Sequence, residues 1–253
     1  MKPQHYSTLQ VARAAGVHPN TVRMYEVWGF LPPIPRAPNG YRRYMEFHVD
    51  QMRLARTALH GGWPGRNIRE SAVGLVRRSA SGDLGGALEQ AYRHLALVQA
   101  ERAQAEAAAS LLERWAQGAA IDTSTKPLHI KEAARLLGVT SDMLRSWERN
   151  GLLKVPRDPR SRYRRYGAAE LDRVRVIRTL SRAGYSNMAI LRMLRRLDAG
   201  ERRNLREALD TPDPHEDVFT AADRWLTTLQ SQELRANALI AQLEAMIRKK
   251  RRR

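Results

Sequence analysis

Residues 16–31 read GVHPNTVRMYEVWGFL, and residues 138–153 read GVTSDMLRSWERNGLL, which is the same pattern 122 residues further along the chain. Each stretch is followed by the four letters YRRY, at residues 41–44 and again at residues 163–166. This spacing is longer than the repeat of a solenoid protein. It therefore indicates two copies of a whole small domain in one chain.

The quoted stretch of each copy carries the signals of two short helices joined by a turn. In the first copy, Ser7 and Gln10 can form a capping box at the start of a helix that Gly16 ends. A proline follows three residues later and favours the start of a second helix. The second copy repeats this order, with Thr140 as the cap of a helix over residues 141–150. This pattern predicts a helix-turn-helix, whose second helix usually enters the major groove of DNA.

A segment rich in proline or arginine follows each helix-turn-helix, at residues 32–40 and 155–162. Prolines and the Asn-Gly pair break a helix and favour turns, and the alternating Tyr and Arg residues after them suit a short strand. We expect a β-hairpin wing in each copy. Two further helices are expected after each wing, at residues 46–60 and 66–79 in the first copy and at residues 168–182 and 187–197 in the second.

A long helix is expected after each copy. Its seam residues are spaced four and three apart in turn, which is the period of a coiled coil. The seam of the first helix is Leu84, Leu88, Ala91, Leu95, Val98, Arg102, Ala105, Ala109 and Leu112. The seam of the second is Val218, Ala222, Trp225, Leu229, Gln232, Ala236, Leu239, Leu243 and Met246.

These features predict a mainly α fold in seven segments, and residues 6–71 align with residues 128–193 without a gap. The basic tail is expected to be disordered and solvated, and the alternative is that it adds nonspecific affinity for phosphate. The segments are a first winged helix-turn-helix domain (1–80), a first long helix (83–118), a linker (119–127), a second winged helix-turn-helix domain (128–198), a connection (199–216), a second long helix (217–248) and the basic tail (249–253).

The charge balance points to a polyanionic partner. The chain has 44 Lys and Arg against 26 Asp and Glu, and the resulting net charge of +18 attracts nucleic acid first and anionic membranes second. Residues 1–122 hold 15 of these basic residues and 10 of the acidic ones, so the second half is expected to bind phosphate more strongly.

Other protein classes are excluded by what the sequence lacks. It has no cysteine, which excludes disulfides, thiolate metal sites and thiol redox sensing. Its seven histidines show no metal-ligand spacing, and it has no serine elbow, glycine-rich phosphate loop or clear carboxylate pair, so we expect no metal, no cofactor and no enzyme activity. No apolar run is long enough for a membrane span, which predicts a cytoplasmic, nucleoid-associated protein without a membrane partner.

The order of these elements resembles the MerR family of bacterial transcription regulators, and the resemblance covers most of both copies. It implies two MerR-type winged helix-turn-helix domains in tandem. The motifs that carry it are residues 6–12, 16–17, 21–26, 29–31 and 41–44 in the first copy, and Ile130, Ala134 and residues 138–139, 144–148, 151–153 and 163–166 in the second.

Members of that family usually work as homodimers whose long helices pair antiparallel, and here both sets of parts lie in one chain. We therefore expect the helix at about 84–117 to pack antiparallel against that at about 217–248, as an intramolecular pseudo-dimer that is a monomer rather than a homodimer. Within the family, activation untwists and bends an overlong promoter spacer for RNA polymerase, which is a form of indirect readout. The implied partners are double-stranded DNA and RNA polymerase at a promoter.

Candidate DNA contacts lie on the second helix and the wing of each copy. Arg23 and Arg145 lie one turn into these helices, where a guanidinium can reach a phosphate or a guanine. The alternative is a surface arginine paired with Glu26 or Glu148. The complete set is Asn20, Thr21, Arg23, Tyr25, Arg42, Arg43, Tyr44, Asp142, Arg145, Trp147, Arg164, Arg165 and Tyr166.

The two copies differ within this set. Asp142 stands where the first copy has Asn20, so the two helices are not expected to read the same half-site. The wing arginines match positions that grip the DNA backbone in the family, and because neighbouring strand residues face opposite ways, only one of each pair need touch DNA. The tyrosines and Trp147 either contact phosphate or pack on the recognition helix, and for Trp147 packing is favoured because its indole has one donor.

The sequence thus predicts a sequence-specific DNA-binding transcriptional regulator that reads an asymmetric operator and distorts promoter DNA. An architectural or recombination accessory protein that bends DNA without regulating a promoter is the alternative. A third hypothesis is a ligand-sequestering protein, in which a cavity is lined by Trp63, Tyr92, Trp115 and Trp225.

Overall fold

The protein is described by a computed structural model, which covers residues 5–61, 65–118, 126–212 and 221–252, without the side chains of residues 221 and 222. These residues are mainly helical, and β structure among them is limited to isolated bridges. The chain forms two compact units. Unit 1 comprises Met1–Ala100 and Leu229–Arg253, and unit 2 comprises Glu101–Thr228. Each unit therefore contains one helix-turn-helix copy and a part of both long helices.

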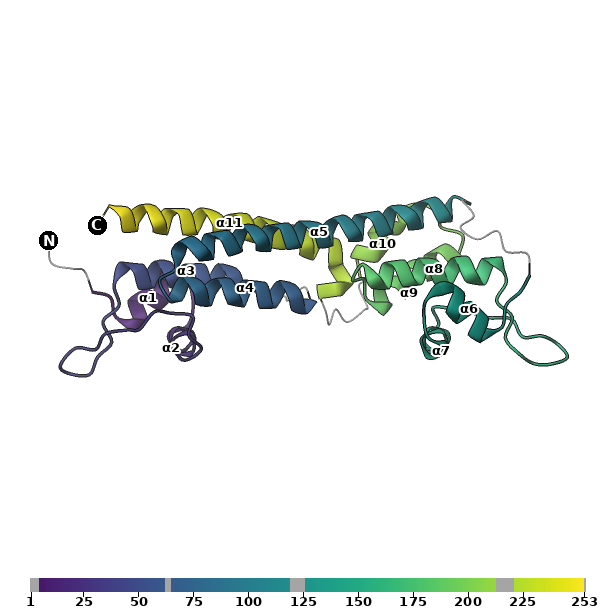
Figure 1. Ribbon diagram of the computed structural model, residues 1–253, viewed down its shortest axis with the longest axis horizontal. Coiled ribbons are helices and arrows are strands. Elements are labelled where there is room, and N and C mark those ends of the chain that lie inside the picture. Colours follow the sequence, from purple (N-terminus) through teal and green to yellow (C-terminus); the bar gives the residue numbers. More distant parts are fainter. Residues whose placement is uncertain (1–4, 62–64, 119–125, 213–220, 253) are drawn as a thin grey trace. The chain divides into compact units, whose positions relative to one another are not determined.

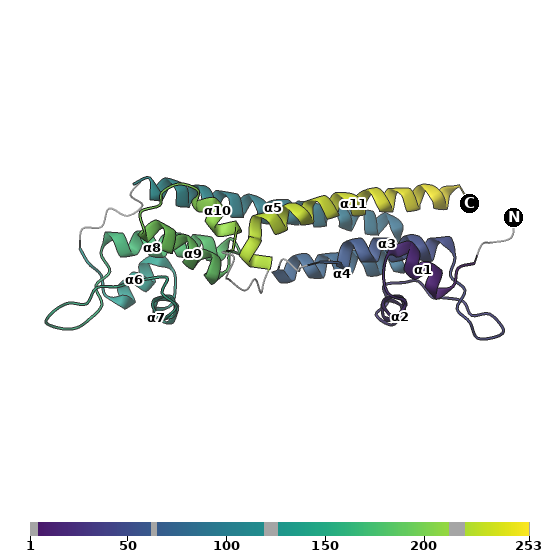
Figure 2. The ribbon, with the colours of Figure 1, turned by 180° about the vertical axis from the view of Figure 1, so that it is seen from behind.

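Unit 1 contains the first copy, which we call head 1. Its helices are α1 (Thr8–Ala15), α2 (Pro19–Val27), α3 (Glu46–Leu59) and α4 (Gly65–Ala80). The first part of α5 (Leu84–Ala116) and the last part of α11 (Trp225–Arg251) complete the unit. Within it, both long helices lie side by side along one face of α3 and α4 (Figures 1 and 2).

Local sequence explains where α1 and α2 begin and end. Ser7 Oγ accepts the backbone N–H of Gln10 at 3.3 Å, and the Gln10 side chain accepts the N–H of Ser7 at 2.8 Å, which confirms the capping box. Gly16 ends α1 with a φ of 63°, a left-handed conformation in which a side chain is strained. His18 then caps α2, because its Nδ1 accepts the N–H of Asn20 at 3.2 Å.

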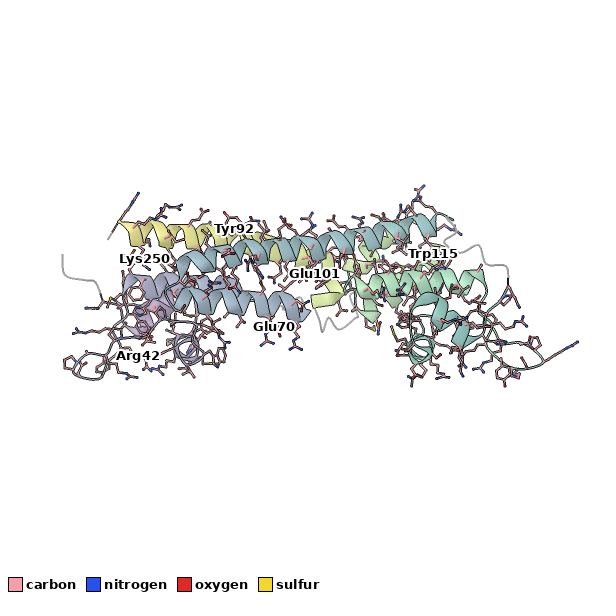
Figure 3. All side chains as sticks on the ribbon, viewed as in Figure 1. Arg42, Glu70, Tyr92, Glu101, Trp115 and Lys250 are labelled. Atoms are coloured by element: carbon pink, nitrogen blue, oxygen red, sulfur yellow. The ribbon has the colours of Figure 1, made fainter. Side chains whose placement is uncertain are left out.

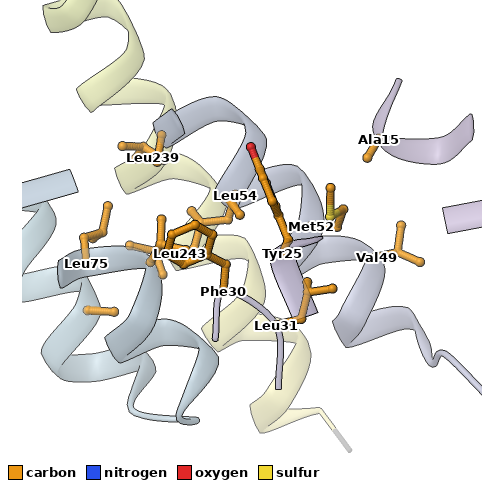
Figure 4. Close-up of a cluster of buried hydrophobic side chains, with 14 of the residues drawn as sticks. Ala15, Tyr25, Phe30, Leu31, Val49, Met52, Leu54, Leu75, Leu239 and Leu243 are labelled. Carbon is orange, nitrogen blue, oxygen red and sulfur yellow. The ribbon is translucent and has the colours of Figure 1, made fainter. Parts of the chain in front are cut away.

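The hydrophobic core of unit 1 includes residues from the far end of the chain. Leu54 of α3 and Leu75 of α4 belong to the same buried cluster as Leu239 and Leu243 of α11 (Figure 4). Each of these four leucines is at most 1% exposed. Burying a leucine contributes roughly 1.5–3 kcal/mol, so the last helix is an integral part of the unit that holds head 1.

Within unit 1, the two long helices run antiparallel. Tyr92 Oη donates to a Glu244 carboxylate oxygen at 3.5 Å, and Gln99 Nε2 donates to Glu233 at 3.0 Å. Residue numbers rise along α5 as their partners' numbers fall along α11, so the expected antiparallel pairing is confirmed in this unit. The predicted seam is also correct here, since Ala91, Val98, Ala236, Leu239 and Leu243 are all buried.

Unit 2 contains the second copy, which we call head 2. Its helices are α6 (Ile130–Leu137), α7 (Ser141–Arg149), α8 (Ala168–Arg182) and α9 (Asn187–Asp198), followed by α10 (Leu205–Asp210) and the 3₁₀ helix η1 (Ala221–Arg224). The last part of α5 packs in this unit. Tyr185 Oη donates to the carbonyl of Ala105 at 3.1 Å, and Arg206 donates to Ser110 Oγ at 3.1 Å.

Helix α10 corrects the expectation that residues 199–216 are only a connection. The buried guanidinium of Arg192 on α9 donates to the carbonyls of Ala208 at 2.6 Å and Leu209 at 3.4 Å. These bonds satisfy carbonyls that a helix C-terminus otherwise leaves without partners. Because α10 is stabilised by this arginine of α9, the sequence of its own six residues does little to predict a helix. Residues 213–216 of the predicted connection lie outside the described residues, as do residues 119–125 of the predicted linker.

The described part of the second long helix differs from the predicted range of 217–248, whose first four residues lie outside the described residues. Residues 221–224 form η1, and α11 starts at Trp225, where the Asp210 carboxylate accepts the N–H of Thr227 at 3.2 Å in the manner of a cap. The helix then continues to Arg251 into the predicted disordered tail. Lys249 pairs there with Glu46 at 3.0 Å and with Asp50 at 2.8 Å, which holds the tail on α3.

The two wings are hairpins held by isolated bridges rather than by regular strands. The bridges are Arg36–Arg42 in head 1 and Arg157–Arg164 in head 2. Between the bridged residues, the loop of head 2 is one residue longer. The segment before the bridge is one residue shorter in head 2, which compensates for the longer loop. The sequences therefore align without a gap, but within the first half of the wing the structurally equivalent residues are shifted by one position.

Candidate nucleic-acid interface

Helix α2 presents a polar face to solvent. Asn20 and Arg23 are exposed and Thr21 is half-buried, while Val22 and Tyr25 point into the core. The Arg23 guanidinium donates to Asn20 Oδ1 at 3.2 Å. This bond holds the two polar side chains together on the exposed face, where they can reach one DNA base step or one phosphate.

Helix α7 presents the equivalent face with a different charge. Arg145 and Asp142 are both exposed, and they form an ion pair at 2.7 Å. The carboxylate compensates part of the arginine's charge, which the neutral Asn20 in head 1 does not do. The two recognition helices thus share an arginine, Arg23 or Arg145, but differ in the charge of the residue that pairs with it.

Each wing is tied to its recognition helix by an ion pair. Arg42 contacts Glu26 at 2.7 Å (Arg42 is labelled in Figure 3), and Arg164 contacts Glu148 at 2.6 Å. All four side chains are only 22–28% exposed. The glutamates therefore pair with the wing and not with Arg23 or Arg145, so the alternative pairing of the recognition arginines is wrong, and Arg42 and Arg164 are held against protein.

The second arginine of each wing faces outward. Arg43 and Arg165 are both exposed. Arg165 is paired with Asp158 at 2.7 Å, and backbone N–H donation from Ser161, together with this arginine, holds the pKa of the Asp158 carboxyl well below its usual range. The exposed member of each pair is thus the one in a position to touch DNA.

The tyrosines at the end of each YRRY are core residues. Tyr44 and Tyr166 are fully buried, and burial raises the pKa of both phenols. This corrects the expectation that they could reach phosphate. The first tyrosines, Tyr41 and Tyr163, are instead 74% and 67% exposed. Applying the alternation of a strand to all four residues, and not only to the arginines, predicts this arrangement.

Tyr25 and Trp147 on the recognition helices are also buried, at 9% and 5% exposure. The Tyr25 ring packs edge-on against Phe30, with ring centroids 5.4 Å apart. Both side chains are packed in the structure, which is the alternative that the sequence left open for Tyr25 and favoured for Trp147.

Head 2 has a basic groove between its recognition helix and its wing. The groove has a volume of about 690 Å³, and its basic lining residues are Lys131, Arg145, Arg157, Arg162 and Arg164. Three of these, Lys131, Arg157 and Arg162, were not among the sequence candidates. The greater positive charge of the second copy is the sequence signal that could have indicated these residues. Two of them contribute to this excess, because head 1 has Leu9 at the position of Lys131 and a glycine at the position of Arg162.

Comparison with known proteins agrees with this geometry. The model of the MerR HTH family regulatory protein matches residues 6–72 and residues 128–197, which together are more than half of the chain. The chain belongs to the MerR family. Its heads are MerR-type DNA-binding domains, and members of this family are regulators of transcription and not enzymes.

Several curated relatives are themselves named as regulators. The chain is 32% identical over 122 residues to a probable heavy metal-dependent transcriptional regulator of Haemophilus influenzae, which covers 48% of this chain and 81% of that protein. It is 36% identical to a mercuric resistance operon regulatory protein of Serratia marcescens (32% of this chain, 55% of that protein) and 36% identical to the HTH-type transcriptional regulator CueR of Escherichia coli O6:H1 (24% and 43%). No solved structure matches the chain.

The structure also bears on metal, membrane and ligand sites. Among the described residues, no group of three or more His, Asp and Glu side chains is placed to hold a metal ion, and no helix is long and apolar enough to cross a membrane. Of the aromatic residues proposed to line a ligand cavity, Tyr92 is half-exposed, Trp225 is buried with its indole N–H on the carbonyl of Ala183, and Trp63 lies outside the described residues. Trp115 lines a crevice of about 500 Å³ in unit 2.

Proposed function

We propose that this MerR-family regulator binds one asymmetric operator with its two diverged heads, as an intramolecular pseudo-dimer. The observation that carries the proposal is the placement of the last helix. Most of α11, from Leu229 onward, belongs to the compact unit of head 1, and Leu243 lies in its core. A helix that a partner subunit supplies in the resembled homodimers is thus supplied here by the same chain.

Two differences between the heads support an asymmetric operator. Asp142 replaces Asn20 beside the recognition arginine, and an acidic group favours cytosine N4 donors where an amide favours adenine. The basic groove of head 2 contains residues that head 1 lacks, Lys131 and Arg162. The residues proposed to contact DNA are Asn20, Thr21, Arg23 and Arg43 in head 1, and Lys131, Asp142, Arg145, Arg162 and Arg165 in head 2.

We further propose that binding distorts promoter DNA so that RNA polymerase can engage it. Support comes from the family, in which indirect readout of a deformed spacer is the mode of action. Arg42 and Arg164 position the wings for this contact through Glu26 and Glu148. The architectural alternative shares all of these contacts and differs only in where on the genome the protein binds.

Genome-wide crosslinking and sequencing separates these functions. The proposal predicts a small number of sites that overlap promoter spacers, each with two unlike half-sites. Footprinting with a Cu-phenanthroline or permanganate probe should then show distortion between the half-sites. Broad occupancy with little sequence preference would favour the architectural protein, and a palindromic motif would contradict the asymmetric reading.

A further inference from the structure

A pocket of about 310 Å³ lies in unit 1 where the end of the recognition helix meets α4. Three aromatic residues from α2 and the segment after it, Tyr25, Trp28 and Phe30, form one side. Arg69, Val73 and Arg77 form the other, and their spacing of four residues places them on one face of α4. The volume is at the small end of the range for ligand sites, so it suits a molecule of one or two rings.

The aromatic side of the pocket offers both ring faces and ring edges. Trp28 and Phe30 meet edge to face with centroids 5.9 Å apart, and Tyr25 and Trp28 lie tilted at 6.1 Å. Trp28 is 48% exposed, whereas Phe30 is 7% exposed. A large aromatic residue left half in solvent beside buried rings provides a surface on which a planar ring can stack.

The α4 side supplies positive charge. The Arg77 guanidinium lies 5.6 Å from the centroid of the Phe30 ring, and both Arg77 and Arg69 are exposed. A guanidinium binds a carboxylate through two parallel hydrogen bonds and also stacks on aromatic rings. A pocket with stacking rings on one side and guanidinium groups on the other therefore recognises a flat molecule that carries a negative group.

Head 2 keeps an aromatic residue, Trp147, at the position of Tyr25, but it lacks the other two aromatic residues and both arginines of the pocket at the equivalent positions. Asn150 stands for Trp28 and Leu152 for Phe30, while Leu191, Arg195 and Ala199 stand for Arg69, Val73 and Arg77. The helices begin at equivalent positions in both heads, since α9 begins 122 residues after α4 just as α7 follows α2, although α9 ends four positions earlier than α4 does. The fold does not require the aromatic and arginine residues, so their presence in head 1 calls for another explanation.

We propose that this pocket binds a small aromatic carboxylate, of one or two rings, stacked on Trp28 with its carboxylate on Arg77. The ligand touches the C-cap of the recognition helix α2 and the last turn of α4 together. Binding fixes the position of α2 against α4. A second step, in which the ligand changes the affinity of head 1 for its half-site, rests on the proposed function.

The test uses the full chain without DNA, and 2-naphthoate as the probe in isothermal titration calorimetry. One site per chain is expected, with a Kd of about 1 mM, given roughly 0.3 kcal/mol for each non-hydrogen atom. The neutral analogue 2-naphthalenemethanol is expected to bind at least about tenfold more weakly, because it lacks the charge that the arginines recognise.

Variants that copy head 2 into head 1 keep the fold and remove the site. Trp28→Asn and Arg77→Ala, which introduce the residues of positions 150 and 199, should each weaken 2-naphthoate at least about tenfold. Arg195→Ala in head 2 is the matched control and should bind as the wild type does. Thermal unfolding by circular dichroism checks that all three variants fold.

Three results would overturn the proposal: no binding of 2-naphthoate at millimolar concentration, equal binding by Trp28→Asn, or equal affinity for the neutral alcohol. Because DNA is absent, these results are independent of the operator model. If the operator model fails, the result for 2-naphthoate binding still stands. If the pocket contacts DNA and not a ligand, Trp28→Asn should weaken operator binding in the absence of any ligand.

Discussion

Arg162 has a φ of 62°, in the left-handed region that glycine prefers, at the turn where head 1 has Gly40 with a φ of 80°. A side chain in this conformation costs about 1 kcal/mol. The guanidinium of Arg157 donates to the carbonyl of Arg162 at 3.4 Å, as Arg36 does to Gly40 at 3.2 Å. Both wings therefore close their loops with an arginine-to-carbonyl bond to a residue in the left-handed conformation, and only in head 2 is that residue an arginine.

We expect Arg162→Gly to stabilise head 2 and to weaken DNA binding. Relief of the backbone strain should raise the free energy of unfolding by about 0.5–1 kcal/mol, and loss of one phosphate contact should reduce the slope of log K against log salt by about 0.9. Urea unfolding and salt-dependent binding measure the two effects. Arg160→Gly in the same loop, whose φ is not in the left-handed region, is the control and should not stabilise. A destabilised Arg162→Gly would contradict the account.

Replacement of the recognition arginines tests the DNA-reading face directly. Arg23→Ala and Arg145→Ala should each weaken specific binding by about 1–3 kcal/mol if the contact is to a base. Arg93→Ala, which removes an exposed arginine of α5 paired with Glu89, is the control and should leave binding unchanged. Fluorescence anisotropy with the operator measures all three. Normal binding by both recognition variants would refute the assignment of α2 and α7.

His48 gives head 1 a predicted dependence on pH. It is fully buried, its Nδ1 accepts the N–H of Met45 at 2.9 Å, and burial lowers its pKa below 6.5. The unfolded chain therefore takes up a proton at a higher pH than the folded chain, so stability is constant above about pH 6.5 and falls as the pH drops through that value. His48→Gln keeps an acceptor and a donor but does not titrate. Urea unfolding at pH 7.5 and 5.5 should show a smaller loss for this variant, and an equal loss would exclude His48 as a source.

At the scale of elements, the most informative helix is α11. Its face toward head 1 carries Leu239 and Leu243, and its last turn carries basic residues that suit the negative end of a helix dipole. Lys249 anchors this turn on α3 through Glu46 and Asp50, and these carboxylates raise the pKa of its ammonium group. The helix thus contributes both apolar and ionic contacts to a head that lies almost the whole chain length away in sequence.

Two leucines of α11 test this contribution. Leu243→Ala removes a fully buried side chain from the core of unit 1 and should cost about 2–5 kcal/mol. Leu234→Ala is the matched control, because Leu234 is on the same helix and 74% exposed, and it should change stability by less than about 0.5 kcal/mol. Thermal and urea unfolding give both values. Equal stability of the two variants would mean that α11 does not complete this core.

The elements also show how far the sequence could predict the structure. The helix-turn-helix, its caps and the long seams follow from local signals such as Ser7, Gly16 and Thr140, whose partners lie within four residues. Features that depend on distant partners were missed. Helix α10 needs Arg192 from α9, the start of α11 needs Asp210, and the ordered tail needs Asp50 of α3.

The same distinction holds for the candidate site. The exposure of Arg23, Arg145 and their neighbours could be predicted, because these residues lie on a helix whose type is recognisable from the sequence. Arg42 and Tyr44 point inward, onto Glu26 and into the core beneath the wing, so the structure does not favour them as DNA contacts. Position within the alternating YRRY was the one local clue, and it applies equally to tyrosine and arginine.

At the scale of the whole molecule, duplication has placed both heads and both coupling helices in one chain. Unit 1 is made from segments that are distant in sequence, residues 1–100 and 229–253, whereas unit 2 is the continuous stretch of residues 101–228. A duplicated chain is free to change each head separately, which a homodimer cannot do. The two heads differ in this way at three places: Asp142 replaces Asn20, the loops of the wings differ in length, and only head 1 has the aromatic pocket.

Native mass spectrometry of the protein with and without its operator duplex tests the central claim, that one chain does the work of a dimer. We predict a free species of 28.8 kDa at micromolar concentration in volatile buffer, and a complex of one chain with one duplex that contains both half-sites. Two chains on one duplex, or a stable dimer in the absence of DNA, would contradict it.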